Sequence, residues 1–307
     1  MSHRKLIGTL CGIGAAVCYG TNPLGALKLY AEGMTTNCVL FYRFGLAWAI
    51  IACVMLFRKE KISVTQKEFL ALTGLGLMFI VSSLTLYPSF HHMAAGVAST
   101  ILFVYPVMTA LIMALMFKER VTPVAATAIL LSLVGVVLLY WTGDSQHLSP
   151  VGVVLVLLSA LSYAIYIIVM NRSKLQMSSF KINFYVLLYC TLGMLAYTVI
   201  AGLPLTLPAT PTSWFYVGWL ALVPAIFALV LLVYSAKYIG STPTAILGAL
   251  EPLTAVLIGI LVFGEAFSLR LAIGIVLILS AVVLIALPPR TRSLHTDRKD
   301  TSDLKPR

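Results

Sequence analysis

The sequence predicts an all-α integral membrane protein whose ten transmembrane helices form two inverted five-helix repeats. Three observations support this fold class: the composition, ten apolar stretches and a duplicated pattern. Of the 307 residues, 60% are hydrophobic and only 10% are charged, and the mean hydropathy is +1.00. Soluble domains carry about 25% charged residues, so these side chains cannot cover a globule in water. The composition excludes a cytosolic enzyme, a nucleic-acid-binding protein and a secreted disulfide-linked domain.

Ten stretches of the chain are long and apolar enough to form helices that cross a bilayer, which takes about 20 residues each. In chain order they are 6–28, 36–57, 69–90, 94–117, 122–141, 150–170, 182–201, 213–236, 242–263 and 269–287. Only helices and closed barrels satisfy backbone hydrogen bonds in lipid, and these stretches lack the alternating pattern of barrel strands. The sequence therefore predicts ten transmembrane helices joined by short loops.

The basic residues predict how these helices are oriented. If the N-terminus lies inside the cell, the inner loops and tail carry 18 Lys and Arg residues, whereas the outer loops carry only Lys28 and Arg270. Inner loops are normally the basic ones. One missed or additional helix would move every later loop to the other side and destroy this asymmetry. We therefore expect a multi-pass protein of the plasma (inner) membrane with both termini in the cytoplasm.

A pattern late in the first half of the chain returns 146 residues further on. The shared residues are Pro106, Leu111, Ile112, Leu115, Phe117 and Glu119, which align with Pro252, Leu257, Ile258, Leu261, Phe263 and Glu265. At an offset of 144, a second set aligns: Gly8, Ala16 and Tyr19 with Gly152, Ala160 and Tyr163. These matches predict that the chain is internally duplicated.

The duplication divides the chain into a first repeat at 1–146, a second repeat at 147–289 and a tail at 290–307. Each repeat holds five helices. Because five is odd, the second repeat enters the membrane from the opposite side, and many secondary transporters are built on such inverted repeats. The tail is polar and basic, so we expect it to be a disordered cytoplasmic extension.

The two copies of the pattern lie in the segments AAGVASTILFVYPVMTALIMALMFKERVT (94–122) and STPTAILGALEPLTAVLIGILVFGEAFS (241–268). They resemble the paired signatures of EamA-type members of the drug/metabolite transporter superfamily, chiefly through Glu251-Pro252 and the late Phe-x-Glu of each half. The resemblance covers essentially the whole chain, although Tyr105 stands where the second half has Glu251. It implies a ten-helix carrier with cytoplasmic termini that moves small metabolites or amino acids, often outward. It does not identify the substrate.

Two ionisable side chains are predicted to lie within the membrane, where charges are costly and usually functional. Arg43 lies about seven residues into its helix, roughly 10 Å deep, and Glu251 about nine residues into its own, roughly 14 Å deep. Across a core of about 30 Å, their heights differ by about 6 Å. They are therefore predicted either to pair directly or to face one central cavity.

Each of these charges has a functional and a structural interpretation. Arg43 is predicted to bind a substrate carboxylate, and the alternative is a pair with Glu251 or with a helix end. Glu251 is predicted to bind a proton or another cation. Its alternative role is to fix the helix beside Pro252, because that proline leaves the carbonyl of Gly248 without its helical partner.

Proline interrupts several predicted helices and is often preceded by a polar residue. The pairs are Asn22-Pro23, Tyr87-Pro88, Tyr105-Pro106, Val223-Pro224 and Thr242-Pro243. Broken helices expose backbone groups that bind substrates or act as hinges. The predicted substrate-binding residues are Arg43, Glu251, Asn22, Tyr87, Tyr105 and Tyr163. Other tyrosines that could line a cavity, or simply pack between helices, are Tyr19, Tyr42, Tyr166, Tyr189 and Tyr234.

Polar residues at the predicted helix ends carry weaker functional signals. We expect Glu119 and Glu265 to pack a loop or cap a neighbouring helix. His91 and His92 share a short turn without an evident third ligand, which favours a plain interfacial turn over a metal site or a pH-sensitive one. The five cysteines lie in apolar stretches and form no metal-like grouping. No metal site and no cofactor are expected.

These observations predict a secondary transporter and not an enzyme. On the resemblance alone, the favoured substrates are amino acids or related compounds and the favoured direction is export. The expected partners are a small-molecule substrate, the lipid bilayer and, as a coupling ion, the proton; no nucleic acid is expected. One alternative is a carrier of another solute class, such as cationic drugs. The other is an intramembrane lipid-modifying enzyme, although the chain lacks Gly-x-Ser-x-Gly and His-Glu-x-x-His motifs.

Overall fold

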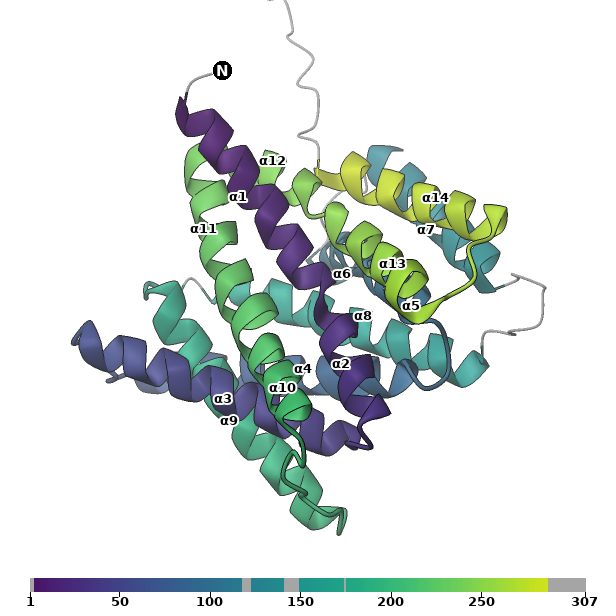
Figure 1. Cartoon of the computed structure of the whole chain (residues 1–307). Coiled ribbons are helices and arrows are strands. Elements are labelled where there is room, and N and C mark those ends of the chain that lie inside the picture. Colours follow the sequence, from purple (N-terminus) through teal and green to yellow (C-terminus); the bar gives the residue numbers. More distant parts are fainter. Residues whose placement is uncertain (1–2, 118–122, 141–148, 174, 287–307) are drawn as a thin grey trace, which may run out of the picture.

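The computed structural model describes residues 3–117, 123–140, 149–173 and 175–286, and within these ranges all regular structure is helical (Figure 1). The first half holds α1 (His3–Gly20), α2 (Asn22–Ala31), α3 (Thr36–Phe57), α4 (Gln66–Ser89), α5 (Ala95–Leu102), α6 (Tyr105–Phe117) and α7 (Pro123–Tyr140). The second half holds α8 (Pro150–Arg172), α9 (Ser179–Ile200), α10 (Pro211–Leu222), a π-helical segment (Val223–Phe227), α11 (Ala228–Ile239), α12 (Ser241–Leu247), α13 (Leu250–Phe263) and α14 (Leu269–Ala286).

These elements confirm the predicted fold class of about ten transmembrane helices. Eight helical stretches are long and apolar enough to cross a bilayer, and the described parts of α7 and α14 add two shorter apolar helices, Ala126–Leu139 and Leu269–Leu284. The predicted boundaries differ from the observed ones by at most three residues, as at α9, which begins at Ser179 where 182 was predicted. The proposed tail at 290–307 lies outside the described residues.

Local sequence explains where several helices begin and end. Thr65 and Glu68 form a reciprocal capping box at the start of α4, in which each side chain bonds the other residue's backbone N–H. The side chain of Thr210 caps α10 by accepting from the Ser213 N–H. At the other end of the chain, α13 stops at Gly264, whose φ of 66° lies in the left-handed region that glycine adopts without steric cost.

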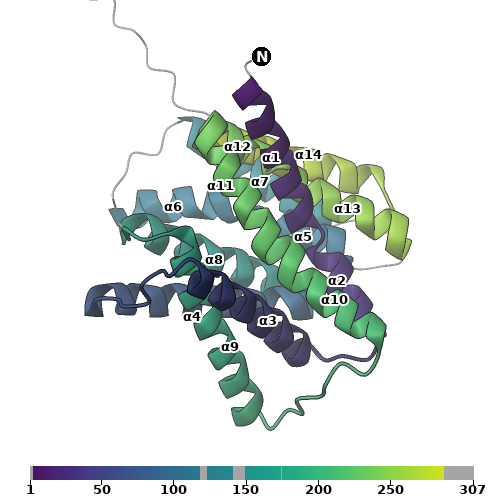
Figure 2. The ribbon, with the colours of Figure 1, turned by 60° about the vertical axis from the view of Figure 1, so that its left-hand side comes forward.

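The two halves of the chain are packed against each other along their length. Helix α1 runs beside α11, α4 packs along α8, and α7 packs along α14 (Figure 1, Figure 2). Helices α3 and α9 cross each other, and α5 packs against α13 (Figure 1). Each of these contacts joins one helix from each half, so that the interior of the bundle lies between the halves.

Three of the five predicted proline interruptions are breaks in the structure. Between α1 and α2 the chain turns at Thr21, whose N–H and hydroxyl both bond the carbonyl of Cys18. Between α5 and α6 it turns at residues 103–104, directly before Tyr105. The third break is the π-helical segment, which contains Pro224.

The other two predicted interruptions are wrong. Pro88 lies in the last turn of α4, and Pro243 lies in the first turn of α12, where its missing N–H has no helical partner to lose. The break in this part of the chain lies instead between α12 and α13, at Gly248 and Ala249.

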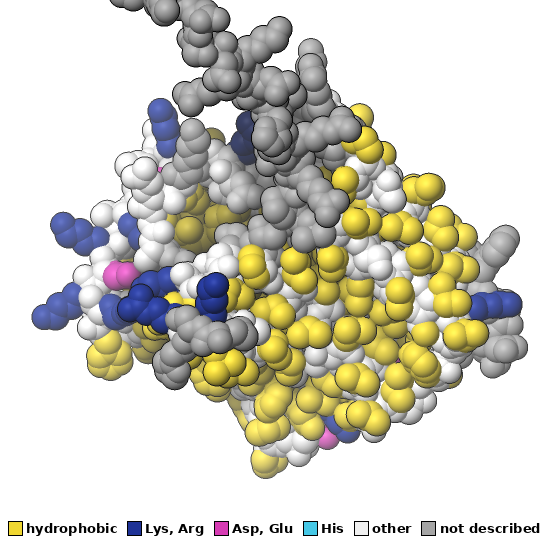
Figure 3. All heavy atoms as spheres, turned by 90° about the horizontal axis from the view of Figure 1, so that it is seen from above, with side chains coloured by type: hydrophobic (Ala, Val, Ile, Leu, Met, Phe, Trp, Pro, Cys, Tyr) yellow, Lys and Arg dark blue, Asp and Glu magenta, His cyan; other side chains and the backbone are white. Residues whose placement is uncertain are grey.

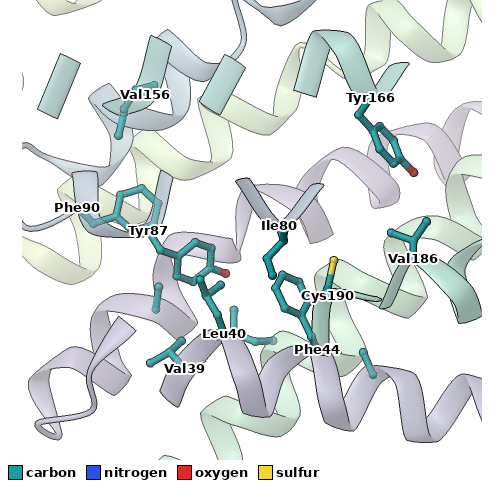
Figure 4. Packing of buried hydrophobic residues seen from close by; sticks show 14 of the residues in the cluster. Val39, Leu40, Phe44, Ile80, Tyr87, Phe90, Val156, Tyr166, Val186 and Cys190 are labelled. Atoms are coloured by element: carbon teal, nitrogen blue, oxygen red, sulfur yellow. The ribbon is translucent and has the colours of Figure 1, made fainter. Parts of the chain in front are cut away.

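Apolar side chains cover much of the outside of the bundle, as expected for contact with lipid. Figure 3 shows a broad hydrophobic face, with Lys and Arg gathered mainly at one edge. Helix-end residues such as Phe57 and Ile200 are 89% and 86% exposed. The interior is packed as well: Tyr87 lies beside Phe90 and Leu40 (Figure 4).

Candidate functional site

Arg43 is buried where α3 meets α2 and α4. Only 7% of this residue is exposed, and α3 is otherwise almost entirely apolar. Its Nη1 donates a hydrogen bond to Tyr87 Oη in α4, and Tyr87 Oη donates to Asn22 Oδ1 at the start of α2 over 3.5 Å. The guanidinium also lies 5.3 Å from the ring centre of Tyr87 and 5.5 Å from that of Phe44. Three of the predicted binding residues therefore meet in one place.

No carboxylate balances the charge of Arg43 within the described part of the chain. Its Nε is buried without a hydrogen-bond partner, and its Nη1 bonds a neutral hydroxyl. Burying a charge without an opposite charge is costly, and such groups in membrane proteins usually serve a ligand or an ion path. A pair between Arg43 and Glu251 is absent from the described residues. The guanidinium therefore has the chemistry to receive a carboxylate or another anion.

Glu251 lies in the first turn of α13, directly after the break between α12 and α13. Its own backbone N–H donates to the carbonyl of Gly248 over 2.9 Å, which satisfies the carbonyl that Pro252 leaves without a helical partner. The structural interpretation from sequence assigned this task to the side chain and is wrong on that point. Among the described residues the Glu251 carboxyl makes no hydrogen bond or ion pair, and the residue is half-buried.

Tyrosines from three helices lie within electrostatic reach of Glu251. Its carboxyl lies close enough to interact electrostatically with the hydroxyls of Tyr19 in α1, Tyr105 in α6 and Tyr163 in α8. The rings of Tyr105 and Tyr163 meet edge to face at 4.7 Å, and Tyr163 stacks on Tyr166 at 5.5 Å. We call Glu251 and these four tyrosines the tyrosine cluster. It unites three predicted binding residues: Glu251, Tyr105 and Tyr163.

Tyr19 connects the tyrosine cluster to Arg43, because its hydroxyl interacts electrostatically with both Glu251 and Arg43. Sequence reasoning did not distinguish Tyr19 and Tyr166 from the other tyrosines. The available signal was the duplication, which aligns Tyr19 with Tyr163. The remaining tyrosines of that set pack elsewhere: Tyr42 on Trp214, Tyr189 on Phe69 and Tyr234 on Tyr238.

Glu265 caps a neighbouring helix, as predicted. It follows α13, and its carboxylate accepts hydrogen bonds from the backbone N–H groups of Ala95 (2.7 Å) and Gly96 (3.3 Å) at the start of α5. Burial raises the pKa of the Glu265 carboxyl, and these two hydrogen bonds oppose part of that rise. Glu119, the equivalent residue of the first half, lies outside the described residues.

The turn with the two histidines belongs to the periphery of this region. The ring of His91 packs on Tyr30 at 4.3 Å, and burial followed by the charge of His92 lowers the pKa of the His91 imidazole. Within the described ranges, no group of three or more His, Cys, Asp or Glu residues is placed to hold a metal ion.

Known proteins resemble this chain along most of its length. Residues 6–141 and 150–287 each match the EamA-like transporter family. The uncharacterized transporter YcbK of Bacillus subtilis is 24% identical over 95% of this chain and 96% of its own. The uncharacterized inner membrane transporter YicL of Salmonella typhimurium is 26% identical over 95% of this chain and 98% of its own.

Two further comparisons agree with this result. An uncharacterized transporter of Archaeoglobus fulgidus is 28% identical over 69% of this chain and 75% of its own. A crystal structure of a protein superposes with a TM-score of 0.65 over 90% of this chain and 95% of its own. That likeness, at 19% sequence identity, establishes the fold alone.

Proposed function

Because this chain belongs to the EamA-like transporter family, and is therefore a multi-pass membrane transporter, we propose that it is a secondary carrier of amino acids or related compounds. The proposed direction is export across the inner membrane. One observation carries the substrate class: the buried guanidinium of Arg43 has no carboxylate partner among the described residues. An amino acid brings the carboxylate that this site can receive.

Arg43 is suited to this task by its fixed position. The hydrogen bond to Tyr87, which itself bonds Asn22, holds the guanidinium between α2, α3 and α4. Arginine presents several N–H donors in a planar arrangement that matches a carboxylate. In this proposal Arg43 binds the substrate carboxylate, and Tyr87 and Asn22 keep the guanidinium in place.

The tyrosine cluster is the proposed site for positive charge. The Glu251 carboxyl makes no hydrogen bond within the described residues, so it is free to accept the substrate's amino group or a proton. Tyr19, Tyr105 and Tyr163 offer hydroxyls and ring faces beside it, and aromatic faces attract cations. Proton coupling through Glu251 is part of this proposal.

The architecture supports alternating access as the mechanism. The first helix of each proposed repeat packs along the third helix of the other: α1 along α11, and α8 along α4. That reciprocal arrangement is what an inverted duplication produces, and two similar halves can exchange conformations of similar energy. The breaks at Thr21 and at residues 103–104 lie next to Asn22 and Tyr105, where hinges would act directly on the site.

The proposed orientation rests on the distribution of Lys and Arg residues among the loops. With both termini in the cytoplasm, the basic residues lie almost entirely in inner loops. Relatives named as inner membrane transporters support the same membrane for this protein.

The test is efflux from proteoliposomes loaded with a pooled amino-acid mixture, read by mass spectrometry with and without a pH gradient. The proposal expects selective loss of a few amino acids, abolished by Arg43→Ala. The matched control is Arg58→Ala, because Arg58 follows the same helix and lies 4.9 Å from the ring of Phe180 but is exposed. Efflux no faster than from empty liposomes would overturn the proposed substrate class.

A carrier of organic cations is the second candidate, and Glu251 is the observation that favours it. A carboxylate surrounded by tyrosines is suited to a cation that has no carboxylate of its own. In that case Glu251→Gln abolishes transport, whereas Arg43→Ala leaves it largely intact. The same vesicles loaded with quaternary ammonium compounds distinguish the two candidates.

A further inference from the structure

Two cation–π contacts lie at opposite ends of the helices that form the tyrosine cluster. Lys28, in the last turn of α2, places its Nζ 5.5 Å from the ring centre of Phe263, the last residue of α13. Arg172, the last residue of α8, places its Cζ 4.0 Å from the ring centre of Phe117, the last residue of α6. Each contact therefore joins the carboxyl ends of two helices.

The internal duplication makes these two contacts equivalent. An offset of 146 aligns Phe117 with Phe263, and the offset of 144 that aligns Tyr19 with Tyr163 also aligns Lys28 with Arg172. In each case the basic residue lies in the last turn of the first helix of one half, and the aromatic residue is the last residue of the fourth helix of the other half. Within each contact the two helices also pack against each other: α2 against α13, and α8 against α6.

We propose that these two contacts are paired clamps, which close the transport path at its two ends and open in alternation. The proposal rests on the proposed carrier function. The helices that the clamps hold together are the ones that carry the tyrosine cluster: α1–α2 has Tyr19, α13 has Glu251, α8 has Tyr163 and α6 has Tyr105. Separation of the carboxyl ends of α2 and α13 would expose the cluster from one end. Separation of α8 and α6 would expose it from the other.

The chemistry of the contacts fits a clamp that must open. A cation on an aromatic face at a helix end is held more weakly than a buried ion pair. Basic residues in the last turn of a helix also interact favourably with the negative end of the helix dipole. Opening the Lys28 clamp therefore has a modest cost, which the binding of a substrate or the closure of the opposite clamp can offset.

The end with Lys28 has an additional contact. The Glu265 carboxylate bonds the N–H groups of Ala95 and Gly96 and lies against Gly96 and Gly259, where any Cβ on Gly259 would collide with it. This contact ties the end of α13, which carries Phe263, to the start of α5.

Side-specific cysteine labelling tests the clamps without a known substrate. The protein carries a single reporter, Tyr163→Cys, with the five native cysteines replaced by serine. Vesicles of defined orientation are treated with a charged methanethiosulfonate that cannot cross the bilayer. We expect Lys28→Met to raise the labelling rate about two- to fivefold from one side of the membrane. Arg172→Met should raise it by a similar factor from the other side.

The controls separate clamping from general loosening. Phe263→Leu and Phe117→Leu remove the rings and should reproduce the effects of Lys28→Met and Arg172→Met, respectively. Lys28→Arg keeps a cation and should label like the parent. Arg58→Met removes a cation from a ring in a contact outside the tyrosine cluster, and it should change neither rate.

The outcomes also separate this proposal from the proposed function. Unchanged labelling in both Met variants, or faster labelling from the same side in both, would overturn the clamps even where amino-acid efflux is intact. Side-specific labelling in the reporter protein, together with no amino-acid efflux by the wild-type protein, would support the clamps and overturn the substrate class.

Discussion

Arg43 and Glu251 are both ionisable groups within transmembrane helices, but their surroundings differ. Arg43 is almost fully buried, donates to Tyr87 and faces two aromatic rings. Glu251 is half-buried, and its carboxyl has no hydrogen-bond partner in the described part of the chain. A group that is tightly held suits recognition of a fixed feature of the substrate. A group that is loosely held suits a change of partner or of protonation during each cycle.

The largest expected effect comes from removing Arg43, the more tightly held of the two charges. Arg43→Ala should weaken substrate binding on the order of a hundredfold, because loss of a charged partner from a buried hydrogen-bonded pair costs about 2–5 kcal/mol. Arg43→Lys keeps the charge but loses the planar donor arrangement, so it should recover only part of the affinity. Concentration dependence of counterflow in proteoliposomes measures both. Wild-type affinity in Arg43→Ala would remove Arg43 from the binding site.

Removing the Glu251 carboxylate is expected to have a different kind of effect. Glu251→Gln should abolish stimulation by a pH gradient while leaving exchange of substrate across the membrane in place. A gradient of one pH unit supplies about 1.4 kcal/mol per coupled proton, so the difference amounts to about a tenfold change in accumulation. Efflux and exchange are measured in the same vesicles. Glu60→Gln is the control, because the Glu60 carboxylate bonds Ser178 at a helix end. Undiminished stimulation by the pH gradient in Glu251→Gln would show that Glu251 does not couple transport to protons, and it would contradict the contrast with Arg43.

A smaller effect is expected from the group that positions Arg43. Tyr87→Phe removes the hydroxyl that accepts from Arg43 and donates to Asn22. Both hydrogen bonds are lost, but they act on the substrate only through the position of Arg43, so apparent affinity should fall about fivefold, equivalent to about 1 kcal/mol, while the maximal rate stays nearly constant. Tyr42→Phe is the matched control, since Tyr42 packs on Trp214. Equal effects of the two variants would contradict the positioning role.

The smallest effect concerns Glu265, a carboxylate with the hydrogen-bond partners that Glu251 lacks. Burial raises the pKa of the folded carboxyl above that of the unfolded chain, so the folded protein binds this proton more tightly. The contribution of Glu265 to stability is therefore largest at acid pH and declines as pH rises through the raised pKa. Glu265→Gln should remove this decline, a difference of about 2 °C in melting temperature. Thermal melts of the purified protein at several pH values measure it, and parallel profiles for both proteins would contradict the assignment.

Sequence reasoning located the helices well because membrane insertion depends on local apolar length. It was wrong at Pro88 and Pro243, since proline in the last or first turn of a helix need not interrupt it. One of its two interpretations of Glu251 had the side chain support the carbonyl of Gly248, whereas a tightened turn lets the Glu251 N–H reach that carbonyl.

The site was only partly predictable from sequence. Arg43, Asn22 and Tyr87 could each be selected because polar groups in apolar helices are rare. Their contact depends on how α2, α3 and α4 pack, and no single stretch of sequence encodes that packing. Tyr19 shows the same limit: its place between Arg43 and Glu251 arises from the fold, and the duplication was its one signal in the sequence.

The π-helical segment at Val223–Phe227 has a consequence for the register of the helix around it. A π turn holds one more residue than an α turn, and one residue corresponds to a rotation of about 100° about the helix axis. Helix α11 is therefore turned in phase relative to α10. This lets α10 direct Trp219 to Thr21 at the break between α1 and α2, while α11 directs Ser235 to Thr244 in α12. One apolar span thus contacts Thr21 through α10 and Thr244 through α11, with the helical register shifted by one residue between the two contacts.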